Sequence, residues 1–232
     1  MTDVSADMSA PAIDPASAVV GILGGTGDQG RGLARRLAMA GNEVLIGSRD
    51  PARAATAATE IADGSSLSVR GAGNADVARE ADVVIVAVPY DGHRDLLAGL
   101  AGELAGKVVV DCVNPLGFDK QGAFALDVAE GSAAQQASAV LPDSRVVAAF
   151  HHVSAVLLLD PSVGEIELDV LVLGDDRAAT DLVQALAGRI AGFRGIYAGR
   201  LRNAHQIEAL TANLISINRR YKAHAGIRVT DV

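Results

Sequence analysis

Short apolar runs alternate with longer amphipathic segments along this chain. Runs at 19–23, 43–46, 82–88 and 107–113 are rich in β-branched residues and predict strands buried on both faces. A weaker run at 67–70 predicts one more strand. Strands of this kind, separated by helical segments, are typical of a parallel sheet with helices on both sides.

The segments between these runs show helical signals. After the first run, Leu33, Leu37 and Ala40 recur at helical spacing, and Gly41 ends the pattern. An alanine-rich helix follows the second run, Asn74 is expected to cap a short third helix, and residues 91–104 predict a fourth. We therefore expect an α/β fold with a doubly wound parallel sheet.

Beyond residue 115 the pattern is looser. Helices are expected at 132–141, 177–190 and 203–224, and strands at 145–150, 168–173 and 193–197. Residues 1–17 are rich in Ala, Ser, Pro and Asp without periodicity, so we expect a disordered tail there. The predicted organisation is this tail, a doubly wound domain over 18–150 and a small C-terminal α/β domain over 151–232.

Charge and composition exclude several classes of function. The net charge is −8 and aromatic residues make up 3%, which argues against nucleic acids and anionic membrane surfaces as partners. Cys112 is the only cysteine, and no basic, apolar leader opens the chain, so a cytoplasmic protein is expected. Residues 189–232 carry eight basic and two acidic residues, either as a solvated basic helix or as a surface for an anionic ligand.

A glycine-rich loop follows the first predicted strand. Gly25-Thr26-Gly27-Asp28-Gln29-Gly30 fits the G-x-G-x-x-G pattern between a strand and a helix. Gly25 is expected at the tight turn, Gly27 at the approach of a pyrophosphate, and Gly30 at the contact between helix and strand. The sequence therefore predicts a dinucleotide site.

The end of the second strand indicates which dinucleotide. An NAD site places an acidic residue there, whereas this chain has Ser48 and Arg49, with Arg53 one helical turn further on. Together with Thr26 these residues can hold a 2′-phosphate through charge-assisted hydrogen bonds. We expect NADP rather than NAD, with Asp50 as a neighbour that could weaken the positive charge.

Few residues are suited to proton transfer. No Ser-Tyr-x-x-x-Lys arrangement occurs, and the His151-His152 pair lacks other ligands at metal-binding spacing, so no metal is expected. Direct hydride transfer between two bound rings needs no catalytic side chain. The alternatives are an NADPH-dependent imine or 3-hydroxy-acid reductase, with His151, His152 or Asp111 as proton donor, and a non-enzymatic NADP-sensing module.

The sequence resembles the F420-dependent NADP reductases (8-hydroxy-5-deazaflavin:NADP oxidoreductases). The resemblance runs from residue 19 through LGGTGDQGRGLARRLAMAGNEVLIGSRDPARA, ADVVIVAVPYDGH, VVVDCVNPL, VVAAFHHVSA and GRLRNAHQIEALTANLISIN. It implies a Rossmann domain for NADP(H), a small domain that closes over coenzyme F420, a homodimer, and hydride transfer without a catalytic acid or base.

The resemblance also implies site residues. Thr26, Ser48, Arg49 and Arg53 would hold the 2′-phosphate, in agreement with the interpretation above. The residues implied at the nicotinamide are Ala87, Val88, Pro89, Asn114 and Pro115. Those implied at the deazaflavin are His152, Val153, Ser154, Ala155, Asn203 and His205, and the anionic tail of F420 would meet Arg202, Arg219 or Arg220.

Overall fold

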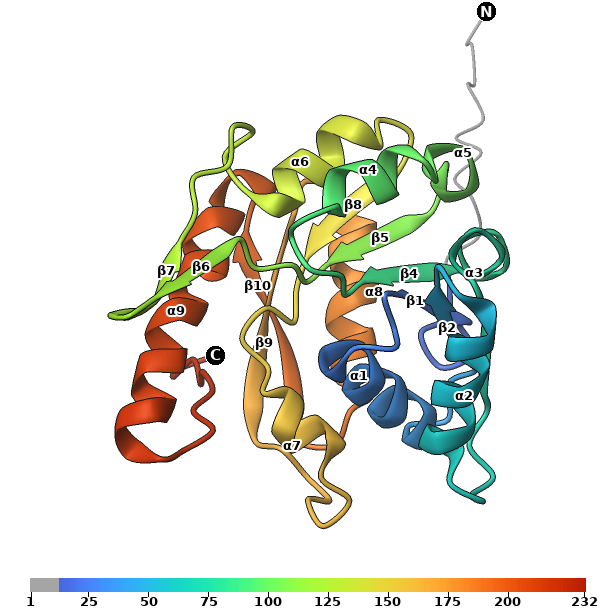
Figure 1. Ribbon diagram of the computed structural model, residues 1–232. Helices are drawn as coiled ribbons and strands as arrows, with labels where there is room; N and C mark the ends of the chain where they lie inside the picture. Colours follow the sequence, from blue (N-terminus) through green and yellow to red (C-terminus); the bar gives the residue numbers. More distant parts are fainter. Residues whose placement is uncertain (1–12) are drawn as a thin grey trace, which may run out of the picture.

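The computed structural model describes residues 13–232, in which one eight-stranded sheet forms the centre of the fold (Figure 1). The strand order is β10-β9-β8-β5-β4-β1-β2-β3. Neighbouring strands pair in parallel, except that β9 runs antiparallel to β8. The predicted α/β class with a doubly wound, Rossmann-like sheet is confirmed.

The strands follow the predicted apolar runs. The sheet consists of β1 Val20–Leu23, β2 Val44–Ser48, β3 Val69–Gly73, β4 Val83–Val86, β5 Val108–Asp111, β8 Arg145–Ala148, β9 Leu168–Gly174 and β10 Phe193–Gly199. A separate antiparallel hairpin, β6 Leu116–Asp119 and β7 Gly122–Ala125, was not predicted. It projects beside the last helix (Figure 1).

The helices connect these strands. They are α1 Asp28–Met39, α2 Pro51–Ala62, α3 Asn74–Glu80, α4 His93–Ala98, α5 Ala101–Leu104, α6 Ala133–Val140, α7 Ala155–Leu159, α8 Arg177–Ala187 and α9 Ala204–Tyr221, with the 3-10 turn η1 Leu201–Asn203 before α9. The predicted helix at 91–104 divides into α4 and α5 near Gly99. α3 begins at Asn74 itself, with Gly73 as its N-cap, and α7 was not predicted.

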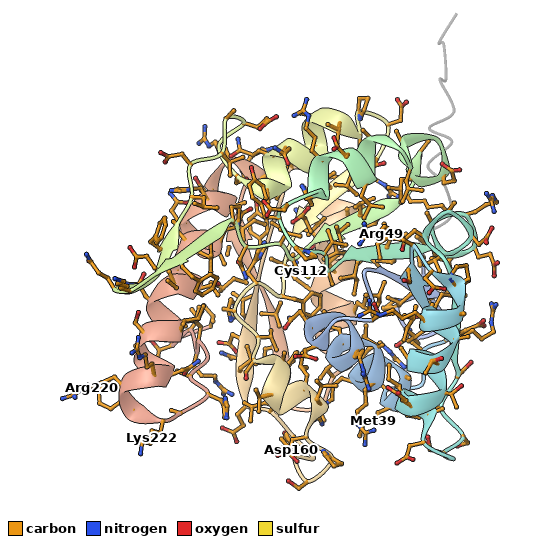
Figure 2. All side chains as sticks on the ribbon, viewed as in Figure 1. Met39, Arg49, Cys112, Asp160, Arg220 and Lys222 are labelled. Atoms are coloured by element: carbon orange, nitrogen blue, oxygen red, sulfur yellow. The ribbon has the colours of Figure 1, made fainter. Side chains whose placement is uncertain are left out.

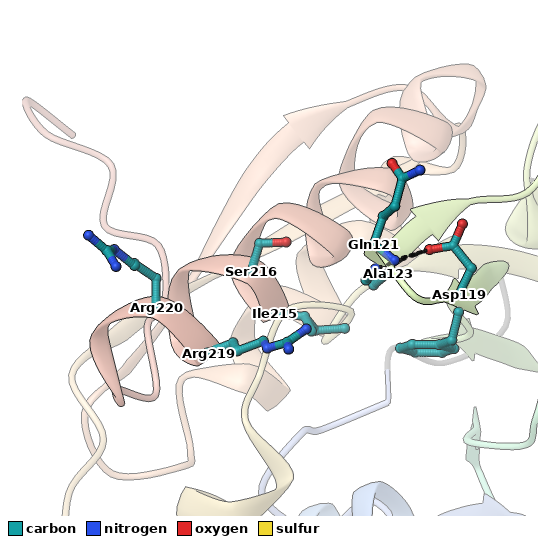
Figure 3. Close-up of a pocket in the computed structure, with 9 residues that line it drawn as sticks. Asp119, Gln121, Ala123, Ile215, Ser216, Arg219 and Arg220 are labelled. Atoms are coloured by element: carbon teal, nitrogen blue, oxygen red, sulfur yellow. Dashed lines mark hydrogen bonds between the residues drawn. The ribbon is translucent and has the colours of Figure 1, made fainter.

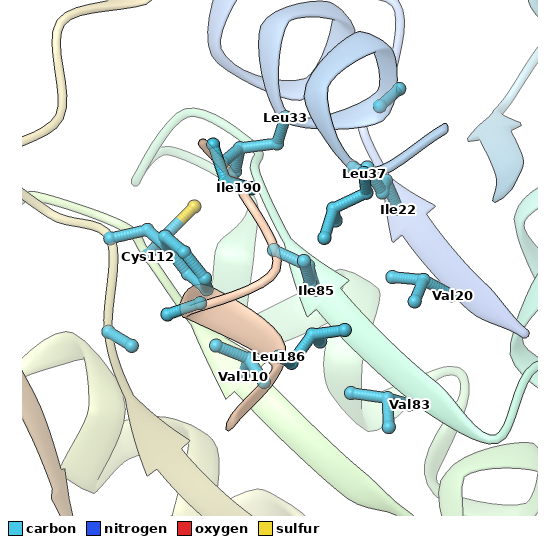
Figure 4. Packing of buried hydrophobic residues seen from close by; sticks show 14 of the residues in the cluster. Val20, Ile22, Leu33, Leu37, Val83, Ile85, Val110, Cys112, Leu186 and Ile190 are labelled. Carbon is cyan, nitrogen blue, oxygen red and sulfur yellow. The ribbon is translucent and has the colours of Figure 1, made fainter. Parts of the chain in front are cut away.

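Successive side chains of a strand point to opposite sides of the sheet. In the central strands both sides are buried, because helices cover each face. Ile22 and Ile85 pack with Leu33 and Leu37 of α1 in one layer (Figure 4). The next residue of each strand faces the other layer, where Leu23 and its neighbours pack against α3, α4, α5 and α6. This two-sided burial explains why the sequence shows unbroken apolar runs rather than alternation.

The expected boundary at residue 150 does not separate two sheets. Ala148 of β8 pairs with Leu173 of β9, and β10 extends the sheet further, so the segment after residue 150 continues the sheet of the preceding one. Periodicity cannot reveal this, because a buried strand has the same pattern whether it joins an old sheet or a new one. Among the described residues, no helix has the length and apolar character to cross a bilayer.

The predicted disordered tail is corrected in part. Residues 1–12 lie outside the described residues, but residues 13–17 form a turn in which Ser17 N donates to Asp14 O at 3.2 Å. Asn42, buried before β2, donates from Nδ2 to Pro15 O at 2.9 Å. This contact with the body of the protein orders a segment that local composition alone would leave free.

The sheet positions the candidate site at the carboxyl ends of β1 and β4. Leu23 at the end of β1 pairs with both Gly47 and Val86, because β1 lies between β2 and β4. The chain turns to opposite sides of the sheet after these two strands, and a crevice opens at such a point. The glycine loop and the residues after Val86 border this crevice.

Candidate functional site

The glycine loop is shaped by steric limits at Gly24 and Gly30. Gly24 has φ +72°, and a Cβ there would lie 2.7 Å from Ala87 O. A Cβ on Gly30 would lie 2.6 Å from Gly25 Cα, so only glycine lets the start of α1 approach the loop. The left-handed turn residue is thus Gly24, one position before the predicted Gly25, because the tight turn begins directly at the end of β1.

Gly27 has a different environment. A Cβ on this residue would meet only Gly24 O, at 3.7 Å, so its backbone borders open space. It is also the extended N-cap of α1, whose first N–H groups point towards that space. An anion in the crevice would therefore meet both an accessible backbone and the positive end of a helix.

A first cavity of about 470 Å³ lies beside this loop. It brings together the four residues predicted for a 2′-phosphate, Thr26, Ser48, Arg49 and Arg53. Arg49, labelled in Figure 2, directly follows the end of β2 at Ser48. The sequence interpretation thus selected residues that are neighbours in space although up to 27 positions separate them.

The carboxylate of Asp50, next to Arg49, is engaged by backbone N–H groups of α2. Asp50 caps α2, where Oδ1 accepts hydrogen bonds from Ala52 N at 3.0 Å and Arg53 N at 3.4 Å. Within the described residues, neither Arg49 nor Arg53 forms a salt bridge. Both guanidinium groups therefore remain available for an anionic ligand.

A second cavity of about 380 Å³ adjoins the first. The two share Gly27, Ala87, Val88 and Pro89, so they meet at the end of β4. The second cavity is further lined by residues of α1, the loop after β5, the loop after β8, and α9: Asp28, Gln29, Cys112, Val113, Asn114, His151, Val153 and Thr211. A ligand in each cavity would contact the other at their junction.

The structure separates the two adjacent histidines. His151 lines the second cavity, is buried, and has no hydrogen-bond partner for either ring nitrogen in the described structure. His152 points away, and its Nε2 accepts a hydrogen bond from Leu171 N of β9 at 3.4 Å. Burial lowers the pKa of each to about 4, so both rings are neutral near neutral pH.

Other predicted residues lie outside the two cavities. Val153 lines the second cavity, but Ser154 and Ala155 form the start of α7 beyond it. Asn203 and His205 lie at the start of α9, near α6, and line neither cavity. Pro115 lines neither cavity, although the preceding Asn114 does.

The comparisons with known proteins agree with this geometry. A family model described as "NADP oxidoreductase coenzyme F420-dependent" matches residues 19–115. An F420-dependent NADP reductase from Methanothermobacter marburgensis is 43% identical over 221 residues, which is 92% of this chain and 98% of that protein. The chain belongs to this reductase family.

Two solved structures place the family in a wider context. A putative F420-dependent NADP reductase from Arthrobacter sp. FB24 is 28% identical, with a TM-score of 0.76 over 92% of this chain and 99% of that one. A pyrroline carboxylate reductase from Plasmodium falciparum has a TM-score of 0.58 at 12% identity, covering 89% of this chain and 65% of that one. This second likeness concerns the fold alone.

In this member of the reductase family, a buried polar pair supports the second cavity from behind. His93 Nε2 donates to Asp111 Oδ2 at 2.6 Å, and His93 Nδ1 lies 3.0 Å from Gln136 Oε1, all three side chains being buried. Burial lowers the pKa of His93, but the hydrogen bond and charge of Asp111 outweigh it and raise that pKa overall. Asp111 Oδ1 also accepts from Val113 N at 3.0 Å, which fixes the loop after β5.

Two further residues were not singled out in the sequence. Thr211 lies among the apolar residues of α9, yet it lines the second cavity. Glu208, one turn before it, is buried and caps α6 by accepting from Ala133 N at 2.9 Å and Ala134 N at 3.1 Å. Burial raises the pKa of Glu208 to about 7. The sequence signal for Thr211 and Glu208 was their position as polar residues among the apolar residues of a predicted helix.

A third hollow of about 530 Å³ lies between α9 and the β6–β7 hairpin. Ile215 and Arg219 of α9 line it, opposite Phe118 and Ala123 of the hairpin. Arg220 also lines this hollow, and Figure 3 shows Arg219 extending towards the hairpin. Thr211 and Ile215 are one turn apart, so α9 passes from the second cavity to this hollow.

Proposed function

We propose that this protein is an oxidoreductase that transfers a hydride reversibly between NADPH and coenzyme F420. The observation that carries the proposal is the junction of two cavities at Gly27 and residues 87–89. One cavity has the residues for a dinucleotide with a 2′-phosphate, and the other can hold a second ring against it. The family membership supports the identity of both cofactors.

The first cavity fits NADP(H). Gly27 and the start of α1 would hold the pyrophosphate, since the backbone there is uncovered and the helix end is positive. Thr26, Ser48, Arg49 and Arg53 would hold the 2′-phosphate. The dinucleotide would then extend along residues 87–89 into the second cavity.

The second cavity fits a neutral, planar ring. Its apolar lining includes Val88, Val113 and Val153, and His151 offers an unpartnered ring nitrogen to a polar edge of the ligand. NADPH supplies the hydride, and F420 takes up this hydride together with one proton from solvent to give the reduced deazaflavin and NADP⁺. The residues of the cavity bind and orient the two rings and exclude water between them.

Among the described residues that line the second cavity, Cys112 and His151 are both poorly suited to act as general acids near neutral pH. Burial raises the pKa of Cys112, whose thiol donates to Val86 O at 3.0 Å, and His151 is neutral. Asp111 is engaged by His93 behind the cavity. An imine or 3-hydroxy-acid reductase requires a proton donor at the substrate, so these features favour direct hydride transfer between cofactors.

We further propose that Arg219 meets the anionic tail of F420. Its guanidinium reaches the third hollow, one helical turn beyond Ile215 and two turns beyond Thr211, and forms no salt bridge within residues 13–232. A homodimer through the hairpin and α9 is supported by the exposed aromatic rings of Phe118, Phe124 and Tyr221. The single buried cysteine supports a cytoplasmic location.

The decisive experiment mixes purified protein with NADPH and F420 and follows the loss of the deazaflavin's visible absorbance. Turnover of F420 with NADPH, and much slower turnover with NADH, is the expected result. Turnover of a cyclic imine or a 3-keto acid without turnover of F420 would favour the alternative reductases. Tight NADP(H) binding without turnover of any of these substrates would favour a sensing module.

A further inference from the structure

The segment 150–164 contributes His151 and Val153 to the wall of the second cavity and packs against α1. Three residues of α1 contact it: Gln29, Gly32 and Arg36, at positions i, i+3 and i+7. Residues with this spacing lie on one side of a helix. The N-cap of the same helix is Gly27, which lines both cavities.

The first contact is at a strained residue. Phe150 is fully buried and has φ +64°, a left-handed conformation that bulky residues rarely adopt. Gln29 Nε2 donates to Phe150 O at 3.3 Å. This contact lies directly before His151, so α1 meets the segment just where it enters the cavity wall.

The second contact is a close approach of the α1 backbone at Gly32 to the side chain of Leu158. A Cβ on Gly32 would lie 2.6 Å from Leu158 Cβ in α7. No other residue type lets α7 pack this closely on α1 without a shift of one helix. The distance between α1 and α7 is therefore set by the absence of a side chain at position 32.

The third contact is a buried arginine that binds only main-chain oxygens. Arg36 is 4% exposed, and its five N–H groups donate to the carbonyls of Leu158, Val163, Gly164, Leu157 and Asp160 at 2.7–3.3 Å. Three of these carbonyls belong to the end of α7, which has no helical partners for them. Within the described residues no carboxylate forms a salt bridge with this guanidinium.

Figure 2 shows Asp160 in the loop that extends below α1 and α7, the loop whose carbonyls Arg36 binds. Burial of a guanidinium is unfavourable unless every N–H is satisfied, and here the segment satisfies all five. Arg36 thus holds residues 157–164 against α1. Gln29 holds Phe150, directly before the cavity-lining His151, against the start of the same helix.

We propose that the Gln29–Gly32–Arg36 face of α1 sets the separation between the two bound cofactors, and that Arg36 is a positioning residue for hydride transfer. The dinucleotide is held at the first turn of α1, and the wall that faces the second ring is held at the following turns. This inference rests on the proposed function, since it assumes a ring in each cavity. Hydride transfer depends steeply on the distance between donor and acceptor.

The test compares Arg36→Lys with a matched control, Arg189→Lys. Lysine retains the charge but replaces a five-donor fork with a single nitrogen, so several carbonyls of 157–164 lose their partners. Arg189 binds the C-cap of α1 and the loop after it, with Nε donating to Asn42 Oδ1 at 2.9 Å and its terminal nitrogen to Ala40 O. It contacts no residue of 150–164 among these hydrogen bonds.

Single-turnover rates are measured with NADPH and with NADPH deuterated at the transferred position. Arg36→Lys is expected to slow hydride transfer by about ten-fold or more and to change the isotope effect and its temperature dependence. The Kd for NADP⁺ should stay within about two-fold of wild type, because the phosphate sites are untouched. Arg189→Lys should leave both the rate and the isotope effect near wild type.

A second variant protects the test against a simple loss of stability. Gly32→Ala keeps Arg36 and strengthens the intrinsic helix propensity of α1, yet its methyl group pushes against Leu158. A slower transfer with an altered isotope effect in this variant supports the proposal. Wild-type rates and isotope effects in both folded variants, Arg36→Lys and Gly32→Ala, overturn it, and so does an equal loss in Arg189→Lys.

Hydrogen exchange provides a readout that does not need F420. Amides of 155–164 should exchange faster in Arg36→Lys than in Arg189→Lys, with NADP⁺ bound in both cases. If the wild-type protein reduces no F420, the proposed function fails while this comparison still decides whether Arg36 holds the segment. Equal exchange in the two variants would refute the role of Arg36 in either case.

Discussion

Asn114 Nδ2 donates to the carbonyl oxygen of His151 at 2.8 Å and so joins the loop after β5 to the loop after β8. Thr211 Oγ1 of α9 lies 3.2 Å from the same oxygen and 3.3 Å from Asn114 Oδ1. Three elements from distant parts of the sequence therefore meet at one backbone carbonyl. The ring of His151 remains free to face the second cavity.

Replacing Asn114 with alanine should weaken use of F420. The variant loses a partly buried hydrogen bond worth about 1 kcal/mol, so kcat/KM for F420 should fall roughly five- to ten-fold. Steady-state kinetics at saturating NADPH measure this. Thr211→Ser keeps the hydroxyl and should stay near wild type, and an equal loss in that variant would contradict the assignment.

Replacing Arg49 with alanine should raise the KM for NADPH. Loss of a charge-assisted hydrogen bond to a phosphate costs roughly 1.5–3 kcal/mol, which corresponds to about ten- to hundred-fold in binding. The KM for NADH should change little, because NADH has no 2′-phosphate. Arg70→Ala is the control, since Arg70 pairs with Glu43 and Glu80 outside the cavities; equal effects on NADPH and NADH would exclude the phosphate assignment.

The buried Glu208 should make stability depend on pH. Its pKa of about 7 in the folded protein lies above the ordinary value of 4.5, so the folded state binds more protons between these values. This group therefore lowers the free energy of unfolding as pH rises from about 5 to 8, by an amount on the order of 3 kcal/mol at most. Besides burial, the nearby charge of Asp111 contributes to this raised pKa, and Glu208 in turn helps to raise the pKa of the buried His93.

The measurement is urea unfolding of wild type and Glu208→Gln at about pH 5 and pH 8. Glutamine keeps one acceptor for the amides of α6 but has no charge to bury. Relative to wild type, the free energy of unfolding of the variant should be about 1–3 kcal/mol higher at pH 8 than at pH 5. A difference that is the same at both pH values would show that Glu208 does not titrate in this range.

Replacing His93 alone should destabilise the protein more than replacing both His93 and Asp111. His93→Leu leaves the Asp111 carboxylate buried without its partner, at an expected cost of about 3–5 kcal/mol. Adding Asp111→Asn removes that charge, so the double variant should be more stable than His93→Leu alone. Thermal and urea unfolding of the single and double variants complete the cycle, and strictly additive losses would contradict a coupled pair.

The sequence predicted the central strands well, and the four residues it selected for a 2′-phosphate line one cavity, because both depend on short-range patterns. The apolar run at 82–88 is long and β-branched, and Thr26, Ser48 and Arg49 lie at the ends of adjacent parallel strands. The sheet brings such strand ends together wherever the doubly wound pattern holds. Local sequence and tertiary arrangement agree at these positions.

The antiparallel direction of β9 could not be predicted in this way. The run LDVLVL at 168–173 is buried on every residue and would look the same in a parallel strand. Likewise, the identity of the inward histidine depends on the left-handed turn at Phe150, which no glycine marks. The roles of His93 and Arg36 required the packing of distant elements, since each looks like an ordinary polar residue of a helix.

Because Arg36 recognises only main-chain oxygens, the amino-acid sequence of the loop that it binds can vary without loss of these hydrogen bonds. Most of the outer side chains at 161–165, including Ser162 and Glu165, are exposed and take no part in that recognition. A library randomised at these two positions should yield many folded proteins, whereas one randomised at position 36 should yield few. A label or tether attached to the side chain at position 162 or 165 should therefore leave the hydrogen bonds between Arg36 and the loop intact.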